Sequence, residues 1–182
     1  MNIPPPILES GRILIRPYGL KDATVLYAMM KANREQLLHT FPQSLAATSS
    51  VLKAKRYITS KNAERKVGVF LICGIFRKED EQLIGHLLFT KFDWTVPKCD
   101  MGYLIDQSQA GKGYATESAE MLMQWAFQVL KMEKITLRIW PENHASIAVA
   151  RKLGAREAGL ALRDFKTTDG RVLDCAWYEV YR

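Results

Sequence analysis

The segment from Lys98 to Trp140 constrains the fold more than any other part of the sequence. It predicts a strand over Lys98 to Ile105, a glycine-containing turn, a long helix after Gly113 and a strand over Ile135 to Trp140. The helix is indicated by apolar residues at helical spacing, namely Ala115, Ala119, Leu122, Met123, Ala126 and Leu130. Because strand–helix–strand connections are right-handed in nearly all proteins, the two strands are expected to be parallel neighbours in one sheet.

The remaining strand candidates are joined by short links and favour antiparallel pairing. They cover Arg12 to Arg16, Val67 to Phe76, Leu83 to Phe89, Ala155 to Lys166 and Val172 to Tyr181, with a turn at Thr168-Asp169-Gly170. Asp22 is a candidate N-cap for a helix that carries Leu26, Met29 and Met30, and one or two helices are expected between Glu35 and Lys66. The prediction is one α+β domain over residues 1–182, with about seven strands in a mixed, mostly antiparallel sheet flanked by helices.

Composition narrows the class of protein. Hydrophobic residues make up 48% of the 182, enough for a core without disulfides, and the three cysteines are too far apart for a zinc-hook or disulfide pattern. No apolar run approaches the roughly 18 residues of a membrane span, so we expect a cytoplasmic protein with no membrane partner. The net charge of +7 favours acidic ligands, but no motif for specific nucleic-acid binding is found.

A phosphate site is suggested by Gly111-Lys112-Gly113, which stands between a strand and the start of the long helix. Main-chain N–H groups at a helix N-terminus lack intrahelical partners and favour an anion, and glycine lets the backbone approach it. A plain glycine-rich turn is the competing interpretation. No segment has the P-loop spacing, and the dinucleotide fingerprint would require a glycine at Thr116.

Several motifs in order along the chain resemble the GNAT (Gcn5-related N-acetyltransferase) superfamily, and in particular its RimJ/RimL-type N-acetyltransferases. They are Gly102-Tyr103-Leu104-Ile105, Gly111-Lys112-Gly113-Tyr114-Ala115-Thr116-Glu117, Trp125-Ala126-Phe127, Pro141-Glu142-Asn143-His144-Ala145-Ser146 and Lys152-Leu153-Gly154. The entry segment from Arg12 to Ala23 and the hairpin through Ile84-Gly85 are similar too, so the resemblance covers nearly the whole chain.

This resemblance implies an acetyl-coenzyme A (acetyl-CoA) site and no metal. The family motif Q/R-x-x-G-x-G/A falls on Ala110 to Ala115, whose amides, with Thr116, are expected to hold the pyrophosphate, although Ala110 replaces the usual Gln or Arg and Gln109 stands beside it. The strand before the loop is expected to splay from its parallel neighbour, so that the backbone of Tyr103, Leu104 and Ile105 receives pantetheine. The cofactor-binding residues implied are Tyr103, Leu104, Ile105, Ala110, Gly111, Lys112, Gly113, Tyr114, Ala115, Thr116, Asn143 and Ser146.

The resemblance also suggests catalytic roles for Asp100 as general base and Ser146 as proton donor to the leaving thiolate, because the tyrosine that many members use maps onto Ala150. A surface aspartate is the competing interpretation of Asp100, and helix capping is that of Asn143 and Ser146. His144 is an alternative base, and Cys99 raises the idea of an acyl-cysteine intermediate, which the direct transfer usual in the family disfavours.

The acceptor is expected to be a primary amine, either the α-amine of a protein or a small molecule such as an amino sugar, polyamine or amino acid. Its site is expected between the region from Glu35 to Lys66 and the last hairpin. A module that binds acyl-CoA as a sensor, without catalysis, is the non-enzymatic alternative. The acyl-chain preference and the oligomeric state, a homodimer among the options, stay open.

Overall fold

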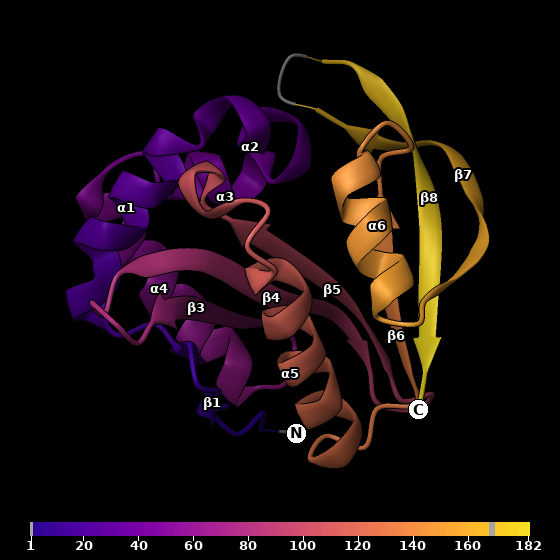
Figure 1. Ribbon diagram of the computed structural model, residues 1–182, viewed down its shortest axis with the longest axis horizontal. Helices are drawn as coiled ribbons and strands as arrows, with labels where there is room; N and C mark the ends of the chain where they lie inside the picture. Colours follow the sequence, from indigo (N-terminus) through magenta and orange to yellow (C-terminus); the bar gives the residue numbers. More distant parts are fainter. Residues whose placement is uncertain (1, 168–169) are drawn as a thin grey trace.

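The computed structural model describes residues 2–167 and 170–182, and its centre is one mixed sheet with the strand order β1-β2-β3-β4-β5-β6-β8-β7 (Figure 1). The strands are β1 (Leu8–Glu9), β2 (Ile13–Pro17), β3 (Leu71–Arg77), β4 (Leu83–Asp93), β5 (Lys98–Ile105), β6 (Lys134–Ile139), β7 (Arg156–Lys166) and β8 (Val172–Tyr181). The helices are α1 (Ala23–Ala32), α2 (Arg34–Thr40), α3 (Pro42–Ala47), α4 (Val51–Lys66), α5 (Tyr114–Gln128) and α6 (His144–Lys152), with 3₁₀ turns η1 (Leu20–Asp22) and η2 (Gln107–Gln109). The expected mixed, mostly antiparallel sheet is confirmed, and the two-residue β1 raises the expected seven strands to eight in the described ranges.

The region between β2 and β3 holds more helix than the sequence suggested. Three helices, α2 to α4, stand where one or two were expected, because Pro42 begins α3 directly after α2 and the Ser50 side chain caps α4 by accepting from the Lys53 N–H. Strand β3 begins at Leu71 rather than Val67, because Val67 ends α4 and Gly68 takes a left-handed φ of 82° that turns the chain.

Asp22 stands at the N-cap position of α1, but its side chain makes no capping hydrogen bond there. Its carboxylate instead accepts from the main-chain N–H of Gly19 at 2.7 Å and from both terminal nitrogens of Arg16 at 2.7 and 3.0 Å. Burial of Asp22 by itself would raise the pKa of its carboxyl. The hydrogen bond and the charge of Arg16 favour the carboxylate more strongly, so the pKa is lowered. Asp22 is thus the N-cap residue of α1, as expected, but its carboxylate binds Arg16 and the Gly19 N–H instead of an N–H of α1.

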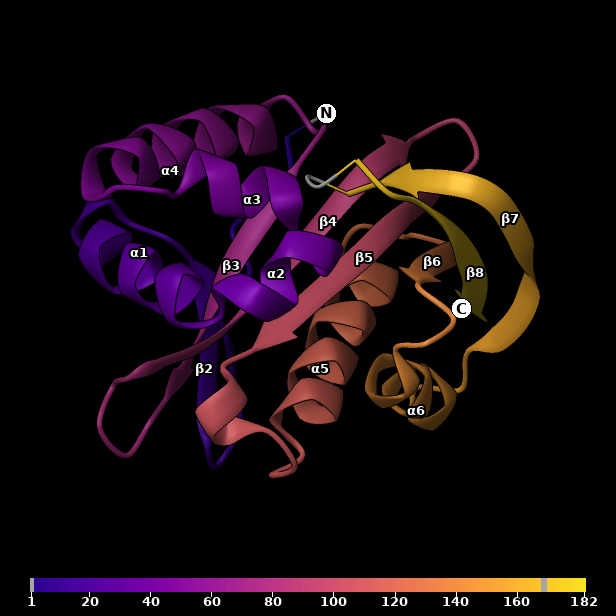
Figure 2. The ribbon, with the colours of Figure 1, turned by 90° about the horizontal axis from the view of Figure 1, so that it is seen from above.

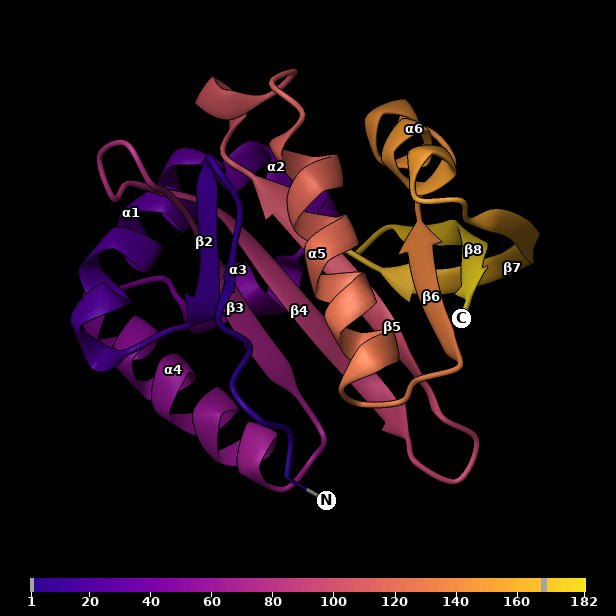
Figure 3. The same cartoon turned by 60° about the horizontal axis from the view of Figure 1, so that its bottom comes forward.

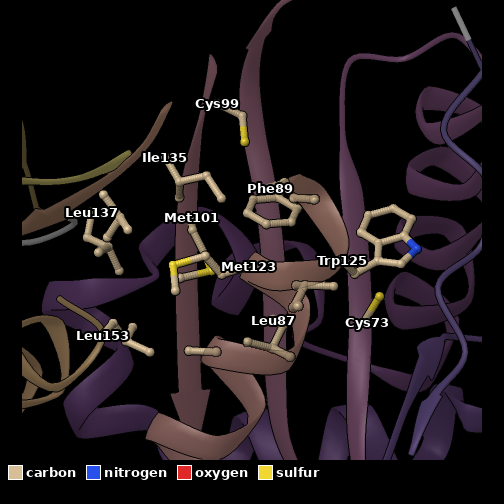
Figure 4. Packing of buried hydrophobic residues seen from close by; sticks show 14 of the residues in the cluster. Cys73, Leu87, Phe89, Cys99, Met101, Met123, Trp125, Ile135, Leu137 and Leu153 are labelled. Carbon is tan, nitrogen blue, oxygen red and sulfur yellow. The ribbon is translucent and has the colours of Figure 1, made fainter. Parts of the chain in front are cut away.

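Helices cover both faces of the sheet and form two cores. Figures 2 and 3 show α1 to α4 on one face and α5 with α6 on the other. The first core packs Leu26, Met30 and Ile58 against the sheet, and the second packs α5 through fully buried residues such as Leu122 and Ala126. In Figure 4 the Met123 side chain of α5 lies beside Met101 of β5, with Phe89 and Ile135 nearby. Each large apolar side chain buried in this way stabilises the fold by about 1.5–3 kcal/mol.

The parallel strands β5 and β6 pair over a short distance and then separate. Only Lys98↔Lys134, Cys99↔Ile135 and Asp100↔Thr136 are register partners in the described structure. Beyond them β5 stays paired with β4 as far as Ile105, and β6 stays paired with β8 as far as Ile139. The sheet therefore opens into a V between β5 and β6, as Figure 1 shows, and the expected splayed pair is confirmed.

The closed end of the V is held by main-chain hydrogen bonds between loops. The carbonyl of Pro97 accepts from the N–H groups of Glu133 at 2.7 Å and Lys134 at 3.2 Å, and the Glu133 carbonyl accepts from the N–H of Arg182 at 3.0 Å. The Lys134 ammonium donates to the Glu179 carboxylate of β8 at 2.8 Å. These bonds fix the point from which the two halves of the sheet diverge.

Candidate active site

The glycine-containing loop lies at the end of β5 that borders the open side of the V, and it leads into α5. Gly111 and Gly113 adopt left-handed φ angles of 77° and 83°, which disfavour side chains. A Cβ at Gly111 would meet nothing within 4 Å, so this part of the loop borders open space. The N–H groups of Gly111, Gly113, Tyr114, Ala115 and Thr116 donate no main-chain hydrogen bond within the described residues, and the first such bond of α5 runs from the Glu117 N–H to the Gly113 carbonyl at 3.1 Å. The loop and helix start thus present a set of free donors and the positive end of a helix dipole.

Arg12, directly before β2, contacts this loop and the first turn of α5. Its Nη1 donates to the Lys112 carbonyl at 3.1 Å, its Nε donates to the Glu117 carboxylate at 3.0 Å, and its guanidinium lies 4.7 Å from the centre of the Tyr114 ring. The Ser10 hydroxyl donates to the same Glu117 at 2.6 Å. This hydrogen bond directs the Lys112 carbonyl toward Arg12. Arg12 and Glu117 stand 105 positions apart, so sequence spacing gave no sign of the contact.

Gln109 does not take the place of the glutamine or arginine that the family has at Ala110. Its side chain is buried, and its carbonyl oxygen accepts from Arg77 Nη1 at 3.1 Å and from Lys112 Nζ at 2.9 Å, while Ala110 is exposed. Gln109 therefore holds the Lys112 ammonium beside the loop. The positive charge is supplied by a neighbouring residue rather than by a side chain at Ala110.

A cavity of about 180 Å³ occupies the opening of the V. Its lining comes from both faces of the sheet, because the cavity passes between the separated strands. The residues are Gln36, His39, Thr40 and Phe41 of α2 and its C-cap, Leu88 and Thr90 of β4, Asp100, Met101, Gly102 and Tyr103 of β5, Leu137, Arg138, Ile139 and Trp140 at β6, Asn143 and Ser146 at α6, Phe165 of β7 and Cys175 of β8. Residues of the 35–66 region and of the last hairpin, between which the acceptor site was predicted, both contribute to the lining. His39, Phe41 and Trp140 were not singled out from the sequence.

Asp100 faces this cavity from the point where β5 and β6 part. Its Oδ2 lies 3.0 Å from Nε of Arg138 and 3.5 Å from Nζ of Lys91. Lys91 is directed there by a left-handed φ of 53° in the irregular part of β4, between Thr90 and Asp93. Both ion contacts use Oδ2, so Oδ1 has no ion partner among the described residues.

Tyr103 crosses the opening and links β5 to α6. Its hydroxyl donates to the main-chain carbonyl of Ser146 at 3.1 Å, and burial raises the pKa of Tyr103 to about 12. Asn143 caps α6, because its Oδ1 accepts from the Ser146 N–H at 3.1 Å. The capping interpretation of Asn143 thus holds, and the same cap fixes Ser146 at the cavity. The structure brings Asp100, Tyr103, Asn143 and Ser146 together around one space.

The alternative catalytic residues are less well placed. Cys99 is buried on the α5 side of β5, near Phe89 and Ile135 (Figure 4), and burial raises the pKa of its thiol. It does not line the cavity, which argues against an acyl-cysteine. His144 is exposed at the first position of α6. Cys175 lines the cavity and was not considered as a site residue from the sequence; burial raises the pKa of its thiol too.

The other predicted loop residues lie at the start of α5. Tyr114 is buried beneath the Arg12 guanidinium, and Ala115 and Thr116 are half-buried in the first turn. Leu104 is buried in the core under α1 to α4, and Ile105 is half-buried.

Within residues 2–167 and 170–182, no group of three or more His, Cys, Asp or Glu side chains is arranged to hold a metal ion. None of the helices in these ranges is long and apolar enough to cross a membrane.

Comparison with known proteins places this site in a family. The chain is 26% identical over 175 residues to an uncharacterized N-acetyltransferase, p20, of Bacillus licheniformis, covering 96% of both chains. It is 24% identical to the [ribosomal protein uS5]-alanine N-acetyltransferase of Escherichia coli, over 95% of this chain and 89% of the other. The fold matches the ribosomal-protein-S5-alanine acetyltransferase of Vibrio fischeri with a TM-score of 0.89 at 19% identity, over 97% of this chain and 96% of that one. A family model described as an acetyltransferase (GNAT) domain matches residues 12–156, and the chain therefore belongs to the GNAT acetyltransferases, a family of acyltransferase enzymes.

Proposed function

We propose that this chain transfers an acetyl group from acetyl-CoA to the α-amine of a polypeptide, by direct attack within a ternary complex. The observation that carries the proposal is the opening between β5 and β6, which begins at Asp100, ends beside the glycine loop and encloses the cavity. The opening gives a linear cofactor a path from the loop on one side of the sheet to an acceptor on the other.

The residues present fit acetyl-CoA. The free N–H groups of Gly111, Gly113 and residues 114–116 suit a pyrophosphate, and Lys112 adds a cation beside them. Along β5, the edge that faces β6 has no strand partner after Asp100, so the backbone from Tyr103 to Ile105 is available to a pantetheine amide. When bound, acetyl-CoA supplies the thioester carbonyl that the amine attacks.

The charges in the cavity favour an α-amine over a polyamine. Asp100 and Arg138 are the formally charged lining residues at pH 7 in the described chain, and they offset one another, so there is no excess negative charge to attract a polycation. An α-amine with a pKa near 8 is also roughly a tenth neutral at pH 7, whereas a lysine-like amine is neutral about one time in 2,500. Deprotonating a lysine-like amine therefore costs about 3 kcal/mol more than deprotonating an α-amine. A site with one ion-paired carboxylate suits the amine with the smaller cost.

In the proposed reaction the amine nitrogen forms a bond to the carbonyl carbon, and the carbon–sulfur bond then breaks. Asp100 takes the amine proton through Oδ1, directly or through one water, while Arg138 and Lys91 hold Oδ2. The Ser146 hydroxyl gives its proton to the thiolate and regains one from the proton that Asp100 took, relayed through water. Tyr103 also lines the cavity, and its hydroxyl is an alternative proton donor to the thiolate. Substituting Tyr103 and Ser146 one at a time distinguishes the two donors.

The experiment is calorimetric titration with acetyl-CoA and CoA, with NADH as the comparison, followed by a thiol-release assay with a short peptide and with spermidine. Micromolar binding of acetyl-CoA and CoA, with turnover of the peptide above that of spermidine, is expected. Binding without turnover of any amine would favour the sensor. Absence of binding would overturn the assignment of the loop. The cytoplasmic location, the single-domain organisation and a homodimer stay predictions.

A further inference from the structure

A second hollow lies between α3 and α4, outside the cavity described above, and has a volume of about 600 Å³. We call it the α3–α4 groove. It is lined by Gln43, Ser44, Ala46 and Ala47 of α3, Lys53, Arg56, Tyr57, Ser60 and Lys61 of α4, and Phe70. None of the roles proposed above uses this groove.

The groove is basic, and little acid is present to neutralise it. Its lining includes Lys53, Arg56 and Lys61 and no acidic residue, and the sequence from Gln36 to Ala63 contains neither Asp nor Glu. Lys61 is paired with Glu64 at 2.8 Å, and Lys53 donates to the Ser49 hydroxyl at 3.0 Å. The exposed Arg56 guanidinium has no ion pair with any described residue. An anionic group would therefore gain a partner here.

The aromatic residues of the groove do not suit a nucleobase. Tyr57 is 8% exposed and its hydroxyl lies 3.3 Å from that of Ser44, so its ring is part of the floor. The Lys61 ammonium lies 3.9 Å from the centre of the Phe70 ring and covers it. Binding of single-stranded nucleic acid depends on open aromatic rings on which bases stack. The combination of cations with covered rings favours carboxylates instead.

Helix α3 separates the groove from the cavity and is short. Its N-cap, Phe41, lines the cavity, while Gln43, Ser44, Ala46 and Ala47 line the groove. Figure 2 shows α3 lying between α4 and α2 on the face of the sheet that carries α1. A six-residue helix is about 9 Å long, and an extended chain advances about 3.3 Å per residue. A peptide whose first residue occupies the cavity would thus reach the groove within roughly three to six residues.

We propose that the α3–α4 groove binds acidic side chains of the polypeptide acceptor, located a few residues after its α-amine, and so selects acceptors with an acidic N-terminal segment. This inference rests on the proposed function. The groove acts in acceptor binding only, since none of its lining residues lines the cavity or belongs to the glycine loop. Its effect is expected in KM rather than kcat.

The test compares two ten-residue peptides that share the same first three residues and carry Asp and Glu, or Asn and Gln, at positions four to six. Thiol release with saturating acetyl-CoA gives kcat/KM for each. The acidic peptide is expected to have about tenfold higher kcat/KM, through KM, and to lose most of that advantage in 0.5 M salt, because exposed charge pairs are screened.

Arg56→Glu is the diagnostic variant and Lys55→Glu is its matched control. Both are exposed on α4 and change the charge equally, but Lys55 does not line the groove. Arg56→Glu is expected to reduce kcat/KM for the acidic peptide about fivefold and to leave the neutral peptide unchanged. Lys55→Glu is expected to change neither by more than about twofold.

The outcomes separate the two proposals. Equal turnover of both peptides would overturn the groove assignment and leave the transferase function intact. No turnover of either peptide, with acetyl-CoA bound, would overturn the polypeptide acceptor itself. If a fluorescent single-stranded RNA of 12 nucleotides bound in a manner lost in Arg56→Glu, while the peptide ratio stayed at one, the groove would be a nucleic-acid site instead.

Discussion

The buried histidine of β4 makes the stability of this protein depend on pH in a way that can be calculated. His86 is 0% exposed, and burial lowers its pKa from 6.5 to about 4. The Tyr18 hydroxyl lies 3.0 Å from its Nδ1, whereas Nε2 has no hydrogen-bond partner in the described structure. The protonated ring would carry an N–H on both nitrogens, but only Nδ1 has a hydrogen-bond partner here. The neutral ring is therefore the stable form.

The sign follows from which state binds the proton. The folded pKa lies below the unfolded one, so between pH 6.5 and 4 the unfolded chain holds more protons and acid favours unfolding. For pKa values of 6.5 and about 4, the free energy of unfolding falls by about 2 kcal/mol from pH 7 to pH 5, and by about 3 kcal/mol when complete. Carboxylates titrate mostly below this window, since their reference pKa values lie near 4.

The assay is urea unfolding followed by tryptophan fluorescence at pH 7, 6 and 5, with the free energy extrapolated to zero urea. His86→Leu removes the titrating group; it should lower the stability at pH 7 by about 1 kcal/mol, through the lost Tyr18 contact, and flatten the pH dependence. His144→Gln, at an exposed position of α6, is the control and should keep the wild-type slope. If His86→Leu lost as much stability as the wild type between pH 7 and 5, the burial argument would be refuted.

Three further predictions concern the active site. Gly111→Val should weaken acetyl-CoA binding at least tenfold by calorimetry, because a β-branched residue disfavours φ of 77° and distorts the loop, whereas Gly11→Val, at an open site without a left-handed φ, should keep the wild-type affinity; unchanged affinity in folded Gly111→Val would refute the loop assignment. Asp100→Asn should reduce kcat/KM for the peptide by about 10²-fold or more in the thiol-release assay; a decrease of less than about twofold would remove Asp100 as the base. Ser146→Ala should lower kcat more than Tyr103→Phe does, and the reverse order in thiol-release rates would transfer the proton-donor role to Tyr103.

The regular parts of this fold could be predicted because their patterns are local. The bounds of β5, from Lys98 to Ile105, and of β8, from Val172 to Tyr181, agree with those expected from apolar and β-branched runs between turns. The α5 helix was indicated by its apolar stripe. Helices α2 to α4 were harder, because much of the 35–66 region is polar and its short helices follow one another without the glycine that often marks a boundary.

The site was predictable where it depends on backbone and not where it depends on distant side chains. Two glycines before a helix indicated the anion-binding loop, and the splayed strands were expected only from the resemblance to a family. The partners of Asp100 could not be foreseen, because Arg138 reaches it through the parallel pairing and Lys91 through an irregularity in β4. Long-range contacts of this kind depend on register and twist, which a single sequence does not encode locally.

The short junction between β5 and β6, from Lys98↔Lys134 to Asp100↔Thr136, means that small rotations there are amplified along the opening. From Asp100 to Ile105 the part of β5 whose β6-facing edge is unpaired extends about 17 Å, so a rotation of about 5° between the two halves of the sheet moves its far end by about 1.5 Å. That is about the length of one carbon–carbon bond. The bonds from Glu133 and Lys134 to Pro97 close this junction outside the cavity, so a small change in them is expected to alter the width of the opening at its far end.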